Sequence, residues 1–228
     1  MEHTGAQEKS EPVHQVPMTS SRILVNNNSL LKAIRFLRLK DQQLASVIKE
    51  TGVPPLWSRR PGFDTLIRII LEQQVSLQSA RSVYRRIRTV TGTVNPDSIS
   101  GLTVQGLRKL GVTRQKAAYC YGLAKIVEAG TVDLGSLNKR SDQEARAELL
   151  SINGVGQWTA DIYLLMALRR TYFWPTGDLS LLVALQKLRG LGNRPTPETA
   201  ARLSRVWSPW RSVAARVLWQ GYLKGILR

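Results

Sequence analysis

The chain has 228 residues, of which 43% are hydrophobic, and its 33 Lys and Arg against 16 Asp and Glu give a formal net charge of +17. This length suits one large domain or two small ones around an apolar core, and the charge favours polyanionic partners, nucleic acid first and an anionic membrane surface second. The one cysteine, Cys120, excludes an internal disulfide, an iron–sulfur cluster and a thiolate zinc site, and both histidines lie near the N-terminus, so acid–base chemistry falls to Asp, Glu, Lys or Tyr.

Residues 1–25 are predicted to form a disordered polar leader ahead of a folded domain over residues 26–228. The leader is polar, contains two prolines and lacks the apolar stretch of a signal peptide. The chain contains no apolar run of the roughly 18 residues that a transmembrane helix needs, so no membrane span is expected.

Apolar residues recur at helical spacing through the N-terminal half. Asn28 or Ser29 can cap a first helix, and Pro54-Pro55 interrupts the pattern that follows it. The next predicted segments are a helix over 63–71, a polar loop over 73–76, a helix over 77–90 and a turn over 92–100.

The C-terminal half continues in the same way. A glycine turn at Gly111 leads into a helix that ends near Ala129, and Ser141 with Glu144 forms a capping box, which predicts a helix start. The remaining predictions are a helix to about Ile152, a tight turn over 153–156, a helix over 157–169, a loop over 172–177, and helices over 179–188, 197–206 and about 210–226. Because no stretch alternates in the manner of a strand, the fold class is predicted to be all-α.

The strongest local signal lies at about 149–161. Two predicted helices are joined there by Gly154-Val155-Gly156, and glycine permits the positive φ and the close backbone approach that a narrow hairpin requires. The start of the second helix offers unpaired N–H groups, where a phosphate oxygen is favoured. The turn alone is equally consistent with a plain corner between two helices.

About 20 residues further on, Pro175-Thr176-Gly177-Asp178 ends a loop and opens a helix. A leucine-rich glycine hairpin followed at this distance by proline and aspartate resembles the helix-hairpin-helix, Gly/Pro-rich, Asp (HhH-GPD) signature of DNA glycosylases. Three further segments resemble the alkylpurine branch, that of DNA-3-methyladenine glycosylase II, and they follow in the same order along the chain. These segments are 70–76, 107–117 and 207–212.

The resemblance implies two interleaved helical subdomains, with the hairpin and an active-site cleft between them. It assigns catalysis to Asp178. Cleavage of a nucleotide's glycosidic bond builds positive charge on the sugar, and a fixed carboxylate nearby stabilises that charge and can activate water. The plain alternative is that Asp178 only caps its helix, and both roles can hold together.

The resemblance also assigns the residues that meet DNA. Gln74 would fill the gap that the flipped base leaves in the duplex. Trp158 and Trp210 would form an aromatic pocket for an electron-poor alkylated purine, with Tyr163 and Trp174 as further candidates, unless these rings are core packing. The backbone of DNA would be held by Gly154, Val155, Gly156, Gln157 and Thr159. Family members can hold a monovalent cation on hairpin carbonyls, and no other cofactor and no metal bound by side chains is expected.

Two positions qualify the resemblance. Bifunctional relatives carry a lysine two positions beyond the second hairpin glycine, where its amine forms a Schiff base with the sugar, and this chain has Trp158 there. Glu72 departs from the family pattern, because a small or neutral residue is expected beside a DNA surface. The basic residues expected to be phosphate contacts or a solvated face are Arg81, Arg85, Arg86, Arg114 and Lys116.

The sequence therefore predicts a monofunctional glycosylase of base excision repair that releases alkylated purines of the 3-methyladenine type and leaves an abasic site. Its predicted partner is damaged double-stranded DNA, with no membrane partner, and it is expected to act as a monomer in the cytoplasm, or at the nucleoid of a bacterium. The alternatives are a glycosylase for oxidised or deaminated bases and a non-catalytic helix-hairpin-helix DNA-binding module. Such a module would need neither Asp178 nor Trp158.

Overall fold

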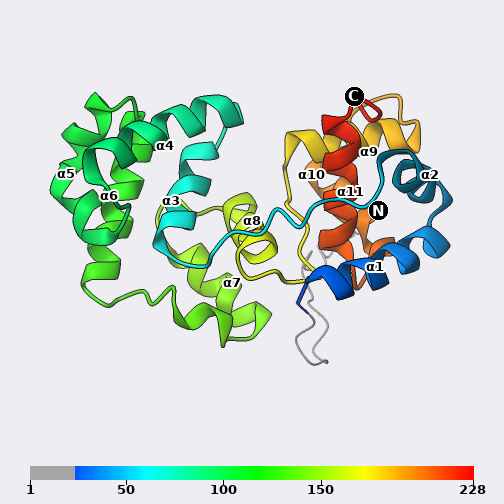
Figure 1. Ribbon diagram of the computed structural model, residues 1–228, viewed down its shortest axis with the longest axis horizontal. Coiled ribbons are helices and arrows are strands. Elements are labelled where there is room, and N and C mark those ends of the chain that lie inside the picture. The colour runs from blue at the N-terminus through cyan, green and yellow to red at the C-terminus, as the bar shows by residue number, and fades with distance from the viewer. Residues whose placement is uncertain (1–23) are drawn as a thin grey trace, which may run out of the picture.

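The computed structural model describes residues 24–228, and Figure 1 shows how its helices are arranged. The predicted leader over residues 1–25 lies outside the described residues up to position 23. Its last two residues belong to the fold, which corrects the predicted boundary. Leu24 forms an isolated bridge with Arg170, and the fully buried Val25 donates its N–H to the Arg169 carbonyl at 2.8 Å.

The helices gather into two lobes, which Figure 1 shows side by side. The hairpin lobe contains α3 (Phe63–Glu72), α4 (Leu77–Thr91), α5 (Pro96–Lys109), α6 (Arg114–Glu128), η1 (Ser136–Asn138), α7 (Asp142–Ser151) and α8 (Gln157–Met166). The terminal lobe contains α1 (Asn27–Lys40), α2 (Gln42–Thr51), α9 (Leu179–Arg189), α10 (Pro197–Leu203), η2 (Ser204–Trp207) and α11 (Arg211–Leu223). No strand is present in residues 24–228, so the predicted all-α class with two helical subdomains is confirmed.

Side-chain caps set several helix starts. Ser141 and Glu144 form the predicted capping box at the start of α7. At α1 the cap is Asn26 rather than Asn28 or Ser29, because the Asn26 side chain accepts the Ser29 N–H while the Ser29 hydroxyl accepts the Asn26 N–H. This reciprocal pair satisfies two backbone donors that the first turn leaves unpaired.

Two predicted boundaries are wrong for local reasons. The turn expected over 92–100 is cut short, because Asn95 caps α5 and Pro96 takes its first position, where a proline fits without loss of a hydrogen bond. The helix expected over 157–169 ends at Met166. Arg169 has a φ of +55°, in the left-handed region that ends a right-handed helix.

Two segments carry the chain between the lobes. The connector, residues 53–62, runs from α2 to α3, and the return loop, residues 167–178, runs from α8 to α9 (Figure 1). Two hydrogen bonds fix the second half of the connector. The Arg59 N–H donates to the Met166 carbonyl at 3.0 Å, and the Gly62 N–H donates to the Tyr163 hydroxyl at 2.7 Å. These bonds bind the connector to α8 and its end.

Arg216 joins the lobes from inside α11, a helix that is buried along nearly its whole length. The side chain is fully buried, and its three donated bonds reach three parts of the chain. Nε donates to the Leu56 carbonyl of the connector at 2.9 Å, Nη2 to the Leu165 carbonyl of α8 at 2.8 Å and Nη1 to the Ser212 carbonyl at 2.8 Å. Burial lowers the pKa of Arg216 to about 10, which leaves the guanidinium charged at neutral pH.

Replacing Arg216 with Met is expected to lower the free energy of unfolding by about 3 kcal/mol, because the buried carbonyls of Leu56 and Leu165 lose their donor. Urea denaturation followed by circular dichroism measures the change. Arg35→Met, on the exposed face of α1, is the matched control and should stay within about 0.5 kcal/mol of wild type. Equal losses in the two variants would contradict the assignment of Arg216 as the junction.

Candidate active site

Asp178 lies at the N-cap of α9, at the end of the return loop. Its Oδ1 accepts the Leu181 N–H at 3.0 Å and the Ser180 hydroxyl, and its own N–H donates to the Pro175 carbonyl at 3.2 Å. The side chain is half-buried. The capping role expected for Asp178 is therefore present, and it fixes the direction of the carboxylate.

Two indoles from different lobes meet this carboxylate. Trp158, in the first turn of α8, donates its Nε1–H to Oδ2 at 3.0 Å, and Trp219, on α11, donates its Nε1–H to Oδ1 at 3.1 Å. Because α8 belongs to the hairpin lobe and α11 to the terminal lobe, Asp178 lies where the two lobes meet. The structure thus brings Trp158 and Asp178 together as the sequence predicted.

Trp219 replaces Trp210 as the second tryptophan at the site. Trp210 lies at the N-cap of α11, about 13 Å along the helix axis from Trp219 at 1.5 Å per residue, and it packs half-buried against the core. The two other aromatic candidates are core residues. Trp174 is 2% exposed and packs on Trp207, and Tyr163 is fully buried.

A third indole lies behind Trp219. The Trp57 ring of the connector meets the Trp219 ring edge to face, with centroids 6.3 Å apart and planes at 74°. Trp57 has a φ of +44°, which a bulky residue adopts only when the surrounding structure holds it there. Trp219 is 8% exposed, whereas Trp57 and Trp158 are half-buried, so these two rings keep some open surface near the carboxylate.

A buried acid on α8 supports the return loop. Asp161 is 2% exposed and accepts a bond from Arg146 Nε at 3.2 Å, and the Thr176 N–H points to its Oδ2 at 3.5 Å. Burial raises the pKa of Asp161 to about 6, against the opposing charge of Arg146. Arg211 donates to the Ser204 hydroxyl and to the Ala201 carbonyl. The ion-pair partner of Asp161 is Arg146, on α7.

The predicted hairpin joins α7 to α8. Gly154 has a φ of +86°, and a Cβ placed there would stand 2.3 Å from the ring of Tyr119, so both backbone conformation and space require glycine. Val155 is buried at the turn, whereas Gly156 and Gln157 are exposed. The chain thus turns sharply and leaves the start of α8 at the surface.

The N-terminus of α8 has no side-chain cap among the described residues, because Gly156 occupies the N-cap. Its first-turn N–H groups therefore point outward without an intrahelical partner. This arrangement suits a phosphate oxygen, as the sequence predicted for Gly156 and Gln157. Thr159, by contrast, is 2% exposed and its hydroxyl accepts a bond from Gln73, so its side chain is not available to DNA.

The structure separates the roles of the two neighbouring glutamines. Gln73 turns inward, where its Nε2 donates to the Gly154 carbonyl and to the Thr159 hydroxyl, each at 2.9 Å. Gln74 is exposed with a φ of +52°. Of the two glutamines, Gln74 is therefore the exposed one, and it is the residue that the resemblance assigned to the wedge.

The basic residues divide into exposed and occupied ones. Arg81 and Arg85 are exposed on α4. Lys116 is not available for a phosphate, because its Nζ donates to the Leu71 carbonyl at 2.8 Å and to the Gln73 carbonyl at 2.6 Å. Arg86 lies against the glycine turn at Gly111, where its Nε donates to the Leu110 carbonyl at 2.7 Å. Lys116 thus holds the chain, whereas Arg86 holds a carbonyl and is also exposed.

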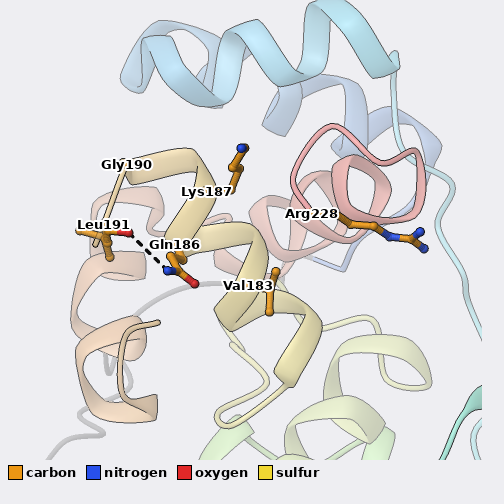
Figure 2. Close-up of a pocket in the computed structure, with 6 residues that line it drawn as sticks. All are labelled: Val183, Gln186, Lys187, Gly190, Leu191 and Arg228. Carbon is orange, nitrogen blue, oxygen red and sulfur yellow. Dashed lines mark hydrogen bonds between the residues drawn. The ribbon is translucent and has the colours of Figure 1, made fainter. Parts of the chain in front are cut away.

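A separate hollow of about 260 Å³ lies at the far end of α9 (Figure 2). It is lined by Val183, Gln186, Lys187, Gly190, Leu191 and Arg228. Lys187 is about 13 Å along α9 from Asp178 at 1.5 Å per residue. The residue that occupies the family's lysine position, beside Asp178, is Trp158.

The expected monovalent cation would need oxygen ligands from the hairpin backbone. The hairpin carbonyls are neutral oxygen donors, and the Gly154 carbonyl, which accepts from Gln73, keeps a second lone pair, so the residues present fit such an ion. Residues 24–228 contain no group of three or more His, Cys, Asp or Glu side chains arranged to hold a metal. In the same part of the chain, no helix has the length and apolar character needed to cross a membrane.

Two helical lobes that meet at one carboxylate, beside a hairpin helix with a free N-terminus, define a helix-hairpin-helix protein with an acidic site. The model of the HhH-GPD superfamily of base excision DNA repair proteins matches residues 67–209, more than half of the chain. The chain therefore belongs to this superfamily.

Individual relatives agree with the superfamily. The chain is 28% identical to a DNA-3-methyladenine glycosylase of Bacillus subtilis, over 76% of this chain and 59% of that protein. Its fold matches a Schizosaccharomyces pombe 3-methyladenine DNA glycosylase in complex with abasic DNA, with a TM-score of 0.78, 25% identity and coverage of 82% and 95%. It also matches a DNA-3-methyladenine glycosidase of Bacillus halodurans, with a TM-score of 0.70, 26% identity and coverage of 83% and 88%. The chain spans 59% and 64% of the length of the two Bacillus subtilis relatives that it matches.

Gly154→Ala is expected to destabilise the protein by about 2–3 kcal/mol, because the added methyl group meets the Tyr119 ring and the backbone has a positive φ. Gly156→Ala is the matched control. Its φ is −87° and nothing lies within 4 Å of the added Cβ, so the expected loss is below about 1 kcal/mol. Denaturant titration of both variants measures the difference, and similar losses would contradict the close contact at Gly154.

Proposed function

We propose that this protein is a monofunctional DNA glycosylase that hydrolyses the N-glycosidic bond of alkylated purines of the 3-methyladenine type. The observation that carries the proposal is the carboxylate of Asp178, held by indole N–H groups of both lobes beside an uncapped hairpin helix. The partner is damaged double-stranded DNA, bound by a monomer. The proposed location is the cytoplasm, or the nucleoid if the source is bacterial.

The chemistry follows from charge. As the bond between base and sugar breaks, positive charge develops on the sugar, and a fixed carboxylate lowers the energy of that state. Hydrogen bonds from Trp158, Leu181 and Trp219 fix the position of the Asp178 carboxylate. Its proposed role is electrostatic and needs no covalent bond to the sugar. Water then completes hydrolysis and leaves an abasic site.

The aromatic surroundings favour an electron-poor base. Alkylation makes a purine electron-poor and often cationic, and such a ring stacks well on the face of an indole. The half-buried rings of Trp57 and Trp158 supply such faces near Asp178. Relatives named for 3-methyladenine support the same substrate class. A glycosylase for oxidised or deaminated bases remains the alternative within the superfamily.

Strand cleavage is not part of the proposal. Cleavage through a Schiff base needs a lysine amine at the sugar, and the residue in that position, Trp158, has no nucleophilic nitrogen, because its N–H is a donor only. This N–H is engaged with Asp178. Asp178 is therefore the acting group of the proposed reaction.

Asp178→Asn is expected to reduce base release from a methylated duplex at least about 100-fold, because the negative charge opposite the sugar is lost. Asn is a good N-cap, so folding and duplex affinity should hold. Single-turnover release followed by mass spectrometry, together with anisotropy on undamaged duplex, measures both. Asp97→Asn, an exposed site on α5, controls for the charge change. Full activity in Asp178→Asn would disprove the catalytic role of Asp178, whereas duplex binding without base release by the wild-type protein would favour the non-catalytic DNA-binding module.

Trp158→Phe keeps an aromatic ring but removes the donor to Asp178 Oδ2, and it should slow base release about tenfold with little change in duplex affinity. Trp210→Phe is the comparison, since Trp210 lies at the start of α11, about 13 Å along the helix from Trp219, which contacts the carboxylate. The single-turnover rates of the two variants decide. A larger loss in Trp210→Phe would restore Trp210 to the site.

Borohydride treatment of the wild-type protein with a duplex that contains a natural abasic site should trap no protein–DNA adduct, and the strand should stay intact until alkali is added. Denaturing gels of the strand and of the protein measure both results. A bifunctional glycosylase with a known Schiff-base lysine serves as the positive control. A trapped adduct would disprove the monofunctional mechanism while leaving the glycosylase proposal standing.

A further inference from the structure

Glu72 occupies an unfavourable position. It is the last residue of α3, where the helix dipole disfavours negative charge, and it directly precedes the loop that carries Gln74. On a surface that receives DNA phosphates, a carboxylate adds repulsion. Contacts within the protein must offset these two unfavourable effects.

Arg59 supplies that contact. Its guanidinium meets the Glu72 carboxylate as a fork: Nη1 lies 3.0 Å from Oε2 and Nη2 lies 3.0 Å from Oε1. The side chains of Arg59 and Glu72 are 23% and 12% exposed, so the pair is largely withdrawn from solvent. Two parallel charge-assisted bonds of this kind fix the angle between the two groups as well as their distance.

The connector that carries Arg59 is anchored to both lobes. Its backbone N–H donates to the Met166 carbonyl at the end of α8. Three residues earlier in the connector, the Leu56 carbonyl accepts Arg216 Nε from α11 at 2.9 Å. The ion pair therefore ties the end of α3 to a segment whose position is set by the lobe junction.

The other contacts at the end of α3 do not reach the connector. Lys116 holds the Leu71 and Gln73 carbonyls from α6, and the Gln73 side chain holds the hairpin, so these bonds stay within the hairpin lobe. Gln74, the exposed tip, follows with its left-handed φ of +52°. The contact from Glu72 to Arg59 reaches toward the junction where Asp178 lies.

We propose that the Arg59–Glu72 ion pair is a positioning device for the wedge, which holds the backbone before Gln74 at a set place relative to the lobe that carries Asp178. The proposal rests on the proposed function, since it assumes that Gln74 enters the duplex. Holding a group in advance removes the entropy cost of ordering it during the reaction. Arg59 and Glu72 touch no reacting atom and act through Gln74.

The test is a double-mutant cycle with Gln74. Glu72→Gln should slow wedge insertion about tenfold in the wild-type background and cause little further loss in a Gln74→Ala background, because a positioning residue has no effect once the group it positions is gone. The readout is stopped-flow fluorescence of 2-aminopurine placed next to a tetrahydrofuran abasic analogue in a duplex. This readout needs no base release.

Two further variants make the cycle decisive. Glu128→Gln is the matched control, because Glu128 pairs with Lys125 at the last turn of α6, away from the loop, and it should leave insertion unchanged. Arg59→Lys keeps the charge but loses the fork, so its insertion rate should fall between wild type and Glu72→Gln. It also serves if Glu72→Gln fails to fold, which a thermal melt reveals.

The proposal is overturned by equal losses from Glu72→Gln in both backgrounds, which would mark a general structural effect, or by no loss at all. A wild-type protein without an aminopurine signal overturns it too, since there is then no insertion to position. Failure of the proposed function looks different. In that case the wild-type protein releases no base from duplex treated with dimethyl sulfate, whatever the insertion cycle shows.

Discussion

The arrangement of the two lobes depends on the buried guanidinium of Arg216. Arg216 carries five N–H donors in a planar fork, so a single buried side chain can reach α11, the connector and the end of α8 together. The same two helices carry the indoles of the site, Trp219 on α11 and Trp158 on α8. Arg216 therefore sets the distance between Trp219 and Trp158, and the carboxylate of Asp178 fits between groups that this arginine has already placed.

The acids around the site have two different kinds of partner. Glu72 and Asp161 each meet an arginine, so their charges are balanced within the protein. The donors to Asp178 in the described structure are all neutral: two indoles, one hydroxyl and one backbone N–H. In a chain of net charge +17, this carboxylate is oriented by neutral donors and forms no ion pair within the described residues.

The parts of the molecule that follow from local rules could be predicted from sequence. Helix periodicity, the capping box at Ser141 and the hairpin at Gly154 depend on neighbours in the chain, and the structure has them in the predicted places. Asp178 as an N-cap followed from its place before an apolar helix. The start of α5 was missed although its signal is local, since Asn95-Pro96 was interpreted as a turn rather than as a cap with proline behind it.

The parts that depend on the meeting of lobes could not be predicted in the same way. Helix α11 is buried nearly all round, so its sequence marks no single inward face, and nothing local distinguished Trp219 from Trp210. The partner of Glu72 lies 13 residues away across a connector without regular periodicity. The inward contact of Gln73 could not be predicted either, because its partner, the Gly154 carbonyl of the hairpin, is 81 residues away.

The hydrogen bonds of Asp178 make its two oxygens unequal. A carboxylate offers about two lone-pair sites on each oxygen. Oδ1 accepts three bonds, from Leu181, Ser180 and Trp219, so its sites are fully occupied, whereas Oδ2 receives only Trp158 among the described donors. The group thus has one closed side and one open side. In the proposed reaction, the sugar would approach the carboxylate from the side of Oδ2.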